Sequence, residues 1–137
     1  MLVVLDTNII VSALLLSKSK PAMIVTLWRE GRFTLLTAEE QIDELMRVTR
    51  YPKIRDKINL ASTGRLINEM RDLATIVDYL PAVDVSPDPD DNYLLSIASG
   101  GKADYLITGD KIDLLALKKY EGTAIVSVSN FLKQTKS

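Results

Sequence analysis

Three aspartates, Asp88, Asp90 and Asp91, stand within four positions of the stretch SPDPDDNYLLSIA, immediately before an apolar helical pattern. Asp88 followed by Pro89 is typical of a helix N-terminus, because the aspartate caps free amides and a proline in the first turn sacrifices no hydrogen bond. Asp91 could complete a capping box, but it also shares the core-facing side of the helix with Leu94. A buried carboxylate needs a cationic partner or a metal ion. The spacing therefore raises the question of which groups balance Asp91.

Two further aspartates directly follow apolar runs that we predict as buried strands: Asp6 ends VVLD, and Asp110 follows LIT in LITGD. In a parallel α/β sheet the functional crevice lies at the carboxyl ends of the strands, where the strand order reverses. Asp6, Asp91 and Asp110 are thus predicted to meet in one pocket, although Asp6 or Asp110 taken singly is better explained as a turn or cap residue. Clustered carboxylates need a cation, and oxygen ligands suit Mg²⁺ or Mn²⁺. Asp113 either extends this cluster or begins the next helix.

The composition limits the chemistry that this chain can perform. It has no histidine and no cysteine, which excludes Ser-His-Asp and Cys-His mechanisms and thiolate zinc sites. An enzyme with this composition must use carboxylates, lysines, hydroxyls or a hard metal ion. The 137 residues, 47% of them hydrophobic, suit one domain spanning 1–137. No apolar run approaches the roughly 20 residues of a membrane span and no basic leader precedes the first strand, so we predict a cytoplasmic protein without membrane contact.

Short apolar segments alternate with amphipathic ones along the whole chain. This alternation predicts a parallel sheet covered on both faces, an α/β three-layer sandwich with a central five-stranded parallel sheet. Side-chain caps are predicted at Asn8, at Thr37 with Glu40 as a capping box, and at Ser129. The predicted strands are 2–6, 32–37, 75–80, 104–110 and 124–128, and the predicted helices are 8–16, 21–31, 37–49, 61–74, 91–101 (ended by its glycine pair), 114–122 and 128–134.

The segments VVLDTNIIVSALL, EEQIDELMRV, DPDDNYLLSIASGGKADYLITGDKIDLL and AIVSVSNFL, in this order, resemble a PIN domain, over essentially the whole chain. The likeness is greatest to the toxin branch, the VapC-like ribonucleases. It implies an acidic site of Asp6, Asp91, Asp110 and a glutamate on the helix after the second strand, with Asp113 contributing in some members. Helical phase alone leaves Asp43 and Glu44 equal; the family pattern favours Glu44. By the same resemblance Asn8 and Thr108 support the site, although turn and cap roles explain them nearly as well.

This resemblance implies an Mg²⁺- or Mn²⁺-dependent endoribonuclease, acting as the toxin of a toxin–antitoxin pair, with an antitoxin partner and a homodimeric state. The sequence singles out no dimer surface, although helix 21–31 offers Met23 and Trp28. A phosphodiester substrate requires basic guidance, and the region around RYPKIRDK is the candidate, unless its charge marks only a solvated surface. The candidate RNA-binding residues are Arg47, Arg50, Tyr51, Lys53 and Arg55.

The alternative from another class is a non-catalytic magnesium-binding regulatory module, receiver-like or a degenerate PIN fold. A receiver has adjacent acids after its first strand and a phosphorylatable aspartate after its third, whereas Thr7 follows Asp6 and Asp78 falls inside the predicted third strand. An aspartyl phosphatase would have an aspartate at the position of Asn8. Degeneration would remove acids from the predicted site, and all four are present.

Overall fold

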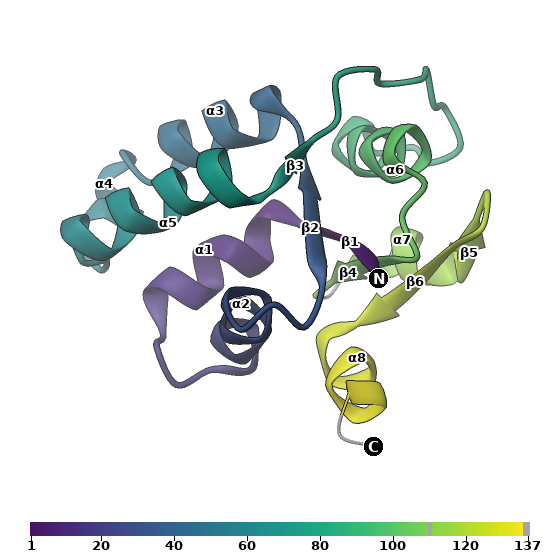
Figure 1. Ribbon diagram of the computed structural model, residues 1–137. Coiled ribbons are helices and arrows are strands. Elements are labelled where there is room, and N and C mark those ends of the chain that lie inside the picture. The colour runs from purple at the N-terminus through teal and green to yellow at the C-terminus, as the bar shows by residue number, and fades with distance from the viewer. Residues whose placement is uncertain (110, 136–137) are drawn as a thin grey trace.

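The computed structural model describes residues 1–109 and 111–135. A six-stranded sheet forms its centre, with the strands in the order β3-β2-β1-β4-β6-β5 (Figure 1). Each neighbouring pair is parallel except β5 with β6. The strands are β1 (Leu2–Leu5), β2 (Thr34–Thr37), β3 (Thr75–Ile76), β4 (Tyr105–Thr108), β5 (Lys119–Tyr120) and β6 (Thr123–Ser127).

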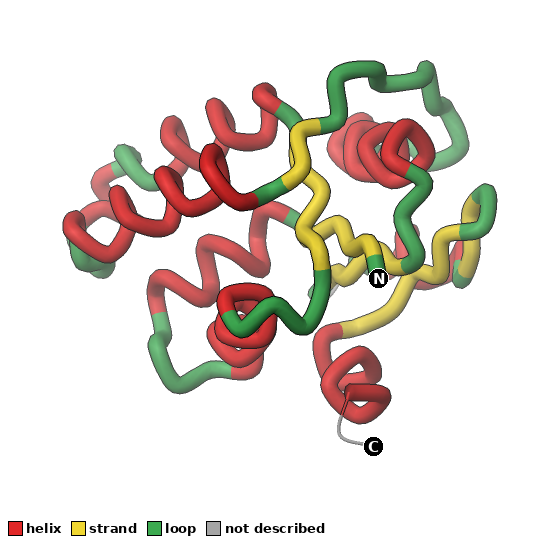
Figure 2. The backbone as a smooth tube through the Cα atoms, viewed as in Figure 1, coloured by secondary structure: helices red, strands yellow, loops and turns green. Residues whose placement is uncertain are grey.

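Helices cover both faces of the sheet, which confirms the predicted α/β sandwich (Figure 2). Side chains alternate along β1, so Val3 and Leu5 enter the larger apolar core while Val4 enters the smaller one. The larger core lies under α1 (Thr7–Leu15), α2 (Lys20–Arg29), α3 (Glu39–Val48), α5 (Leu60–Leu73) and α8 (Val128–Thr135), and the smaller one under α6 (Pro89–Gly101) and α7 (Ile112–Leu117). A short helix, α4 (Pro52–Arg55), connects α3 to α5.

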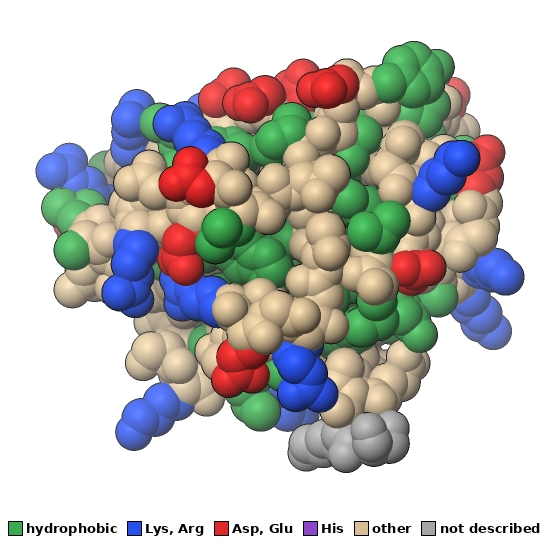
Figure 3. All heavy atoms as spheres, in the orientation of Figure 1, with side chains coloured by type: hydrophobic (Ala, Val, Ile, Leu, Met, Phe, Trp, Pro, Cys, Tyr) green, Lys and Arg blue, Asp and Glu red, His purple; other side chains and the backbone are tan. Residues whose placement is uncertain are grey.

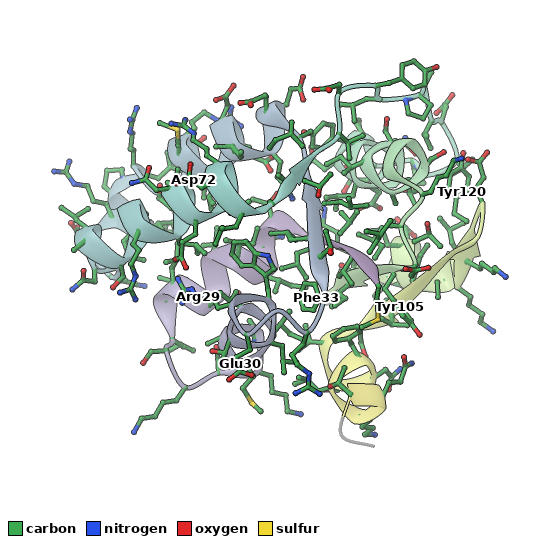
Figure 4. All side chains as sticks on the ribbon, viewed as in Figure 1. Arg29, Glu30, Phe33, Asp72, Tyr105 and Tyr120 are labelled. Atoms are coloured by element: carbon green, nitrogen blue, oxygen red, sulfur yellow. The ribbon has the colours of Figure 1, made fainter. Side chains whose placement is uncertain are left out.

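Aromatic contacts hold the C-terminal helix against the sheet. Phe131 of α8 packs edge-on against Phe33 and Tyr105, with ring centroids 5.8 and 5.6 Å apart. Phe33 and Tyr105 point toward α8 from two separate segments of the chain (Figure 4). Edge-to-face packing of this kind adds to the apolar burial and helps to hold α8 against the sheet.

The sheet has six strands rather than the predicted five, because the sequence pattern did not indicate the hairpin of β5 and β6. The predicted helix 114–122 ends instead at Leu117, and the following residue, Lys118, has φ 59°. Residues 119–120 then pair antiparallel with β6 through a turn at Glu121 (φ 46°) and Gly122 (φ 87°). Two successive positive φ values are typical of a type I′ hairpin turn. Glutamate is a poor indicator of that turn, so the sixth strand was missed.

Several predicted helix ends were also wrong. Helix α1 begins at Thr7 with Asp6 as its cap, not Asn8. Helix α3 has Ala38 at its N-cap and no side-chain cap, so the predicted capping box of Thr37 and Glu40 does not form. The Ser127 hydroxyl, rather than Ser129, accepts the amide hydrogen bond at the start of α8.

Helix α6 ends at Gly101, within the glycine pair that was predicted to end it, and Lys102 follows as its C-cap in a left-handed conformation at φ 55°. These glycines are also needed for close packing. A Cβ on Gly100 would collide with the carbonyl oxygen of Tyr79, and one on Gly101 would lie 2.7 Å from Leu36 Cδ1. The segment after β3 therefore passes directly against the end of α6. Strand β3 itself is only two residues long, so Asp78 lies beyond it and not inside it as predicted.

Candidate active site

Asp6 lies at the carboxyl end of β1, at the point where strand order reverses between β1 and β4. It is only 2% exposed. Its Oδ1 accepts a hydrogen bond of 3.0 Å from the backbone amide of Asn8, and its Oδ2 accepts one of 2.9 Å from the Thr108 hydroxyl at the end of β4. Both predicted supporting residues thus contact Asp6, one through its backbone and one through its side chain. The carboxylate is held in one orientation at the edge of the sheet.

Asp91 lies in the first turn of α6 and is 2% exposed. The Asp88 side chain caps this helix as predicted, by accepting the amide of Asp90 at 2.9 Å. Asp91 makes a different contact: its Oδ2 accepts a hydrogen bond of 2.9 Å from the Ser86 hydroxyl. Its Oδ1 accepts no hydrogen bond and is buried. Asp91 is therefore not a capping-box residue, and its Oδ1 atom is available to a cation.

The cation beside Asp91 is Lys111, whose Nζ lies 3.3 Å from Oδ1. Burial of Lys111 lowers its pKa, but Asp6, Asp91 and Asp88 outweigh this effect and raise the pKa above its ordinary value. The lysine is thus held in its charged form between two buried acids. Sequence reasoning missed Lys111 and Ser86. The only available signal was that buried Asp91 required a positive partner.

A small pocket of about 80 Å³ opens beside Asp6 at this edge of the sheet. Glu44 of α3 lines it, whereas Asp43 is exposed and faces a separate surface groove. The structure thus separates the two acids that helical phase left equal, and places Glu44 beside Asp6. The lining residues are Asp6, Thr7, Asn8, Glu44, Val48, Asp90, Tyr93, Leu94 and Lys111.

Tyr93 adds an aromatic hydroxyl to this pocket that the sequence did not indicate. Its hydroxyl oxygen is buried and makes no hydrogen bond of good geometry. Burial raises the pKa of the Tyr93 phenol, and the carboxylates of Glu40 and Glu44 raise it further, while the nearby Gln41 backbone opposes the rise weakly. The phenol is therefore kept neutral next to Glu44.

Gln41 links the helix that carries Glu44 to the strand that carries Asp6. It is 1% exposed, and its Nε2 donates to the Leu5 carbonyl oxygen at 2.8 Å and to the Thr7 hydroxyl at 3.2 Å. The Thr37 hydroxyl donates to its Oε1 at 2.6 Å. Leu5 and Thr7 flank Asp6, so one amide side chain fixes both neighbours of that carboxylate. Gln41 was also missed; its position on the buried side of α3 with Leu45 was the signal.

Two of the predicted acids are not placed in the pocket. Asp110 lies outside the described residues. Asp113 is exposed in the first turn of α7 and does not line the pocket. Within residues 1–109 and 111–135, no group of three or more acidic side chains comes close enough to hold a metal ion.

The predicted RNA-binding residues all lie at the surface, on the last turn of α3 and on and before α4. Figure 3 shows Lys and Arg side chains gathered at the left of the molecule, over the ends of α3, α4 and α5, with acidic side chains along its upper edge. Arg47, Arg50 and Tyr51 line a surface groove of about 360 Å³ beside Asp43. Of the two residues suggested for a dimer surface, Met23 is 47% exposed, but Trp28 is 6% exposed and belongs to the core.

No single helix in the described part of the chain has the length and apolar character needed to cross a membrane. Only α1 and α2 taken together, which meet at a 103° bend, reach that length and composition.

Comparison with known proteins agrees with this geometry. Residues 2–112 match the family model described as a PIN domain. The chain is 30% identical, over 117 residues, to Uncharacterized protein MJ1680 of Methanocaldococcus jannaschii; the match covers 85% of this chain and 74% of the relative. No solved structure matches the chain significantly. The chain therefore belongs to the PIN domain family, whose members generally have a nuclease-type fold and activity.

Proposed function

We propose that this protein is a metal-dependent endoribonuclease and the toxin of a toxin–antitoxin pair. The observation that carries the proposal is the pair of buried carboxylates, Asp6 and Asp91, fixed by hydroxyl donors at the strand-order reversal with Glu44 facing the same pocket. Membership of a nuclease family supports hydrolysis of a phosphodiester.

The donor set suits a hard divalent cation. Every candidate ligand is a carboxylate, and Asp91 Oδ1 is a buried oxygen without a hydrogen bond. Asp6, Asp91 and Asp110 would hold Mg²⁺ or Mn²⁺, with Glu44 as a further ligand. A bound divalent ion supplies a water of lowered pKa and neutralises developing phosphate charge.

The remaining steps fall to the chain's own side chains. Thr108 and the Asn8 amide keep Asp6 from rotating, and Ser86 does the same for Asp91. Glu44 would position the attacking water, and the neutral Tyr93 phenol beside it would offer a hydrogen-bond donor to a phosphate oxygen. Such preorganised groups stabilise the transition state because they need no rearrangement during the reaction.

RNA is favoured as the substrate by the basic surface next to the pocket. Helix α3 presents Glu44 and Val48 to the pocket and Arg47 to the groove that Arg50 also lines, so a strand held by the arginines can extend toward the acids. Tyr51, 47% exposed in the same groove, offers a ring on which an unpaired base can stack. Lys53 and Arg55 continue the positive surface for the phosphate backbone.

The receiver-like alternative is disfavoured by topology. Receiver domains have the strand order 2-1-3-4-5, with the first strand between the second and third. Here β1 lies between β2 and β4, and β3 is the outer strand. Asp78, which follows β3, is exposed and lies on the far side of β2 from the pocket.

Cleavage of a panel of structured and single-stranded RNAs, in Mg²⁺ or Mn²⁺ against EDTA, tests the catalytic proposal. Asp91→Asn should abolish cutting, whereas Asp84→Asn, the same exchange at an exposed acid of the preceding loop, should not. Metal-independent cutting, or full activity in Asp91→Asn, would refute the assigned chemistry. Binding of metal without cutting by the wild type would favour the non-catalytic module.

The toxin role has its own test. Induced expression of the wild type, but not of Asp91→Asn, should arrest growth of a bacterial host, and co-expression of the protein encoded by the adjacent gene should relieve the arrest. Light scattering should give twice the 15.2 kDa chain mass if the protein is a homodimer. Equal growth with both variants would contradict the toxin role while leaving the nuclease assay to decide the chemistry.

A further inference from the structure

Lys111 supplies the positive charge beside buried Asp91. Its side chain is 22% exposed and leads from the segment before α7 into the pocket. Its ammonium lies 3.3 Å from Asp91 Oδ1, the buried oxygen that accepts no hydrogen bond. Asp6, Asp90 and Glu44 line the pocket that Lys111 enters.

The ammonium and a divalent ion cannot share this position. Both would be attracted by the same carboxylate oxygen, and a positive ammonium a few Å from a divalent ion repels it. The two buried carboxylates also cannot lose a cation without replacement, since an uncompensated buried charge is strongly destabilising. The Lys111 side chain is partly exposed, so its ammonium can turn away from the pocket toward solvent.

We infer that Lys111 is an internal counter-ion that occupies the metal position in the metal-free protein and leaves it when a divalent cation binds. Lys111 then sets the metal concentration at which the site fills: the acids are always balanced, either by the lysine or by the metal. This inference rests on the proposed metal-dependent function and adds a control on the same site.

Titration with Mn²⁺ by calorimetry tests the inference without relying on activity. The variants are Lys111→Met, which keeps the length of the side chain, and Lys119→Met, an exposed lysine of β5, as the matched control. Lys111→Met should bind Mn²⁺ on the order of tenfold more tightly than the wild type, because the competing charge is gone. In EDTA it should also melt at a lower temperature than the wild type, and Mn²⁺ should restore its stability. Lys119→Met should match the wild type in both measurements.

The outcomes separate the two proposals. Equal Mn²⁺ affinity in the wild type and Lys111→Met would overturn the counter-ion role and leave the metal site intact. Weaker binding by Lys111→Met would also overturn it, because Lys111 would then be supporting the ligands rather than competing with the metal. Failure of all three proteins to bind Mn²⁺ would overturn both the inference and the metal-dependent function.

Discussion

Replacing Gln41 with leucine should lower the free energy of unfolding, by an amount that can be worked out from the hydrogen bonds in the structure. The exchange keeps most of the buried volume but removes three hydrogen bonds, to the Leu5 carbonyl and to the Thr7 and Thr37 hydroxyls. At about 1 kcal/mol for each net bond, the free energy of unfolding should fall by about 3 kcal/mol. For a chain of this length that corresponds to a melting temperature lower by about 12 °C.

Urea denaturation in EDTA, followed by tryptophan fluorescence, measures this change. Trp28 is the single tryptophan and is 6% exposed, so its emission reports global unfolding. Glu40→Leu, at the exposed preceding position of α3, is the control and should change stability by less than about 0.5 kcal/mol. Thr37→Val should lower the free energy of unfolding by about 1 kcal/mol. Because both substitutions remove the same hydrogen bond, the double variant with Gln41→Leu should lose about 1 kcal/mol less than the sum of the two single variants.

The reasoning would be refuted if Gln41→Leu stayed within about 0.5 kcal/mol of the wild type, or if its effect and that of Thr37→Val were simply additive. Either result would mean that the network around Asp6 is not held by Gln41. A confirmed loss would identify a residue that positions the carboxylate without touching a substrate.

Three smaller predictions use the same urea assay. Tyr93→Phe should leave the protein as stable as the wild type or more stable by about 1 kcal/mol, because the buried hydroxyl has no good partner; a clear loss would reveal one. Gly100→Ala should cost about 2 to 3 kcal/mol through the collision with the Tyr79 carbonyl, and an unchanged midpoint would show that the loop moves freely. Lys102→Gly should add about 0.5 to 1 kcal/mol, since φ 55° strains any side chain, and a loss would mean that the Lys102 side chain matters more than its backbone.

The parts of the fold that follow from local patterning could be predicted from sequence. Apolar runs such as 2–5 and 105–108 are buried on both faces, and this uniform burial is what a parallel strand requires. The hairpin at 119–127 could not be predicted, because its turn needs two positive φ values and a glutamate such as Glu121 does not indicate a positive φ. The caps of α1, α3 and α8 were displaced by one or two residues. At α1 and α8 neighbouring polar residues compete for the same amides, whereas α3 follows Ala38 and has no side-chain cap.

Those residues of the candidate site whose burial follows from their place in a strand or helix could be predicted from the sequence. Asp6 follows a central strand and Asp91 lies on the inner side of a helix, and both are buried in the structure. Lys111 and Gln41 were not predictable, because their roles depend on contacts among segments far apart in sequence. Gln41 contacts residues 34 and 36 positions away, a pairing that no local pattern records.

The hydrogen bond between Thr108 and Asp6 joins residues separated by 102 positions. During synthesis, the acidic pocket therefore cannot form until residue 108 has been added and β4 can pair with β1. A truncated or unfinished copy carries Asp6 and Glu44 but neither β4 nor Lys111. The order of the strands thus ties the appearance of a complete acidic centre to the synthesis of β4, more than 100 residues after β1.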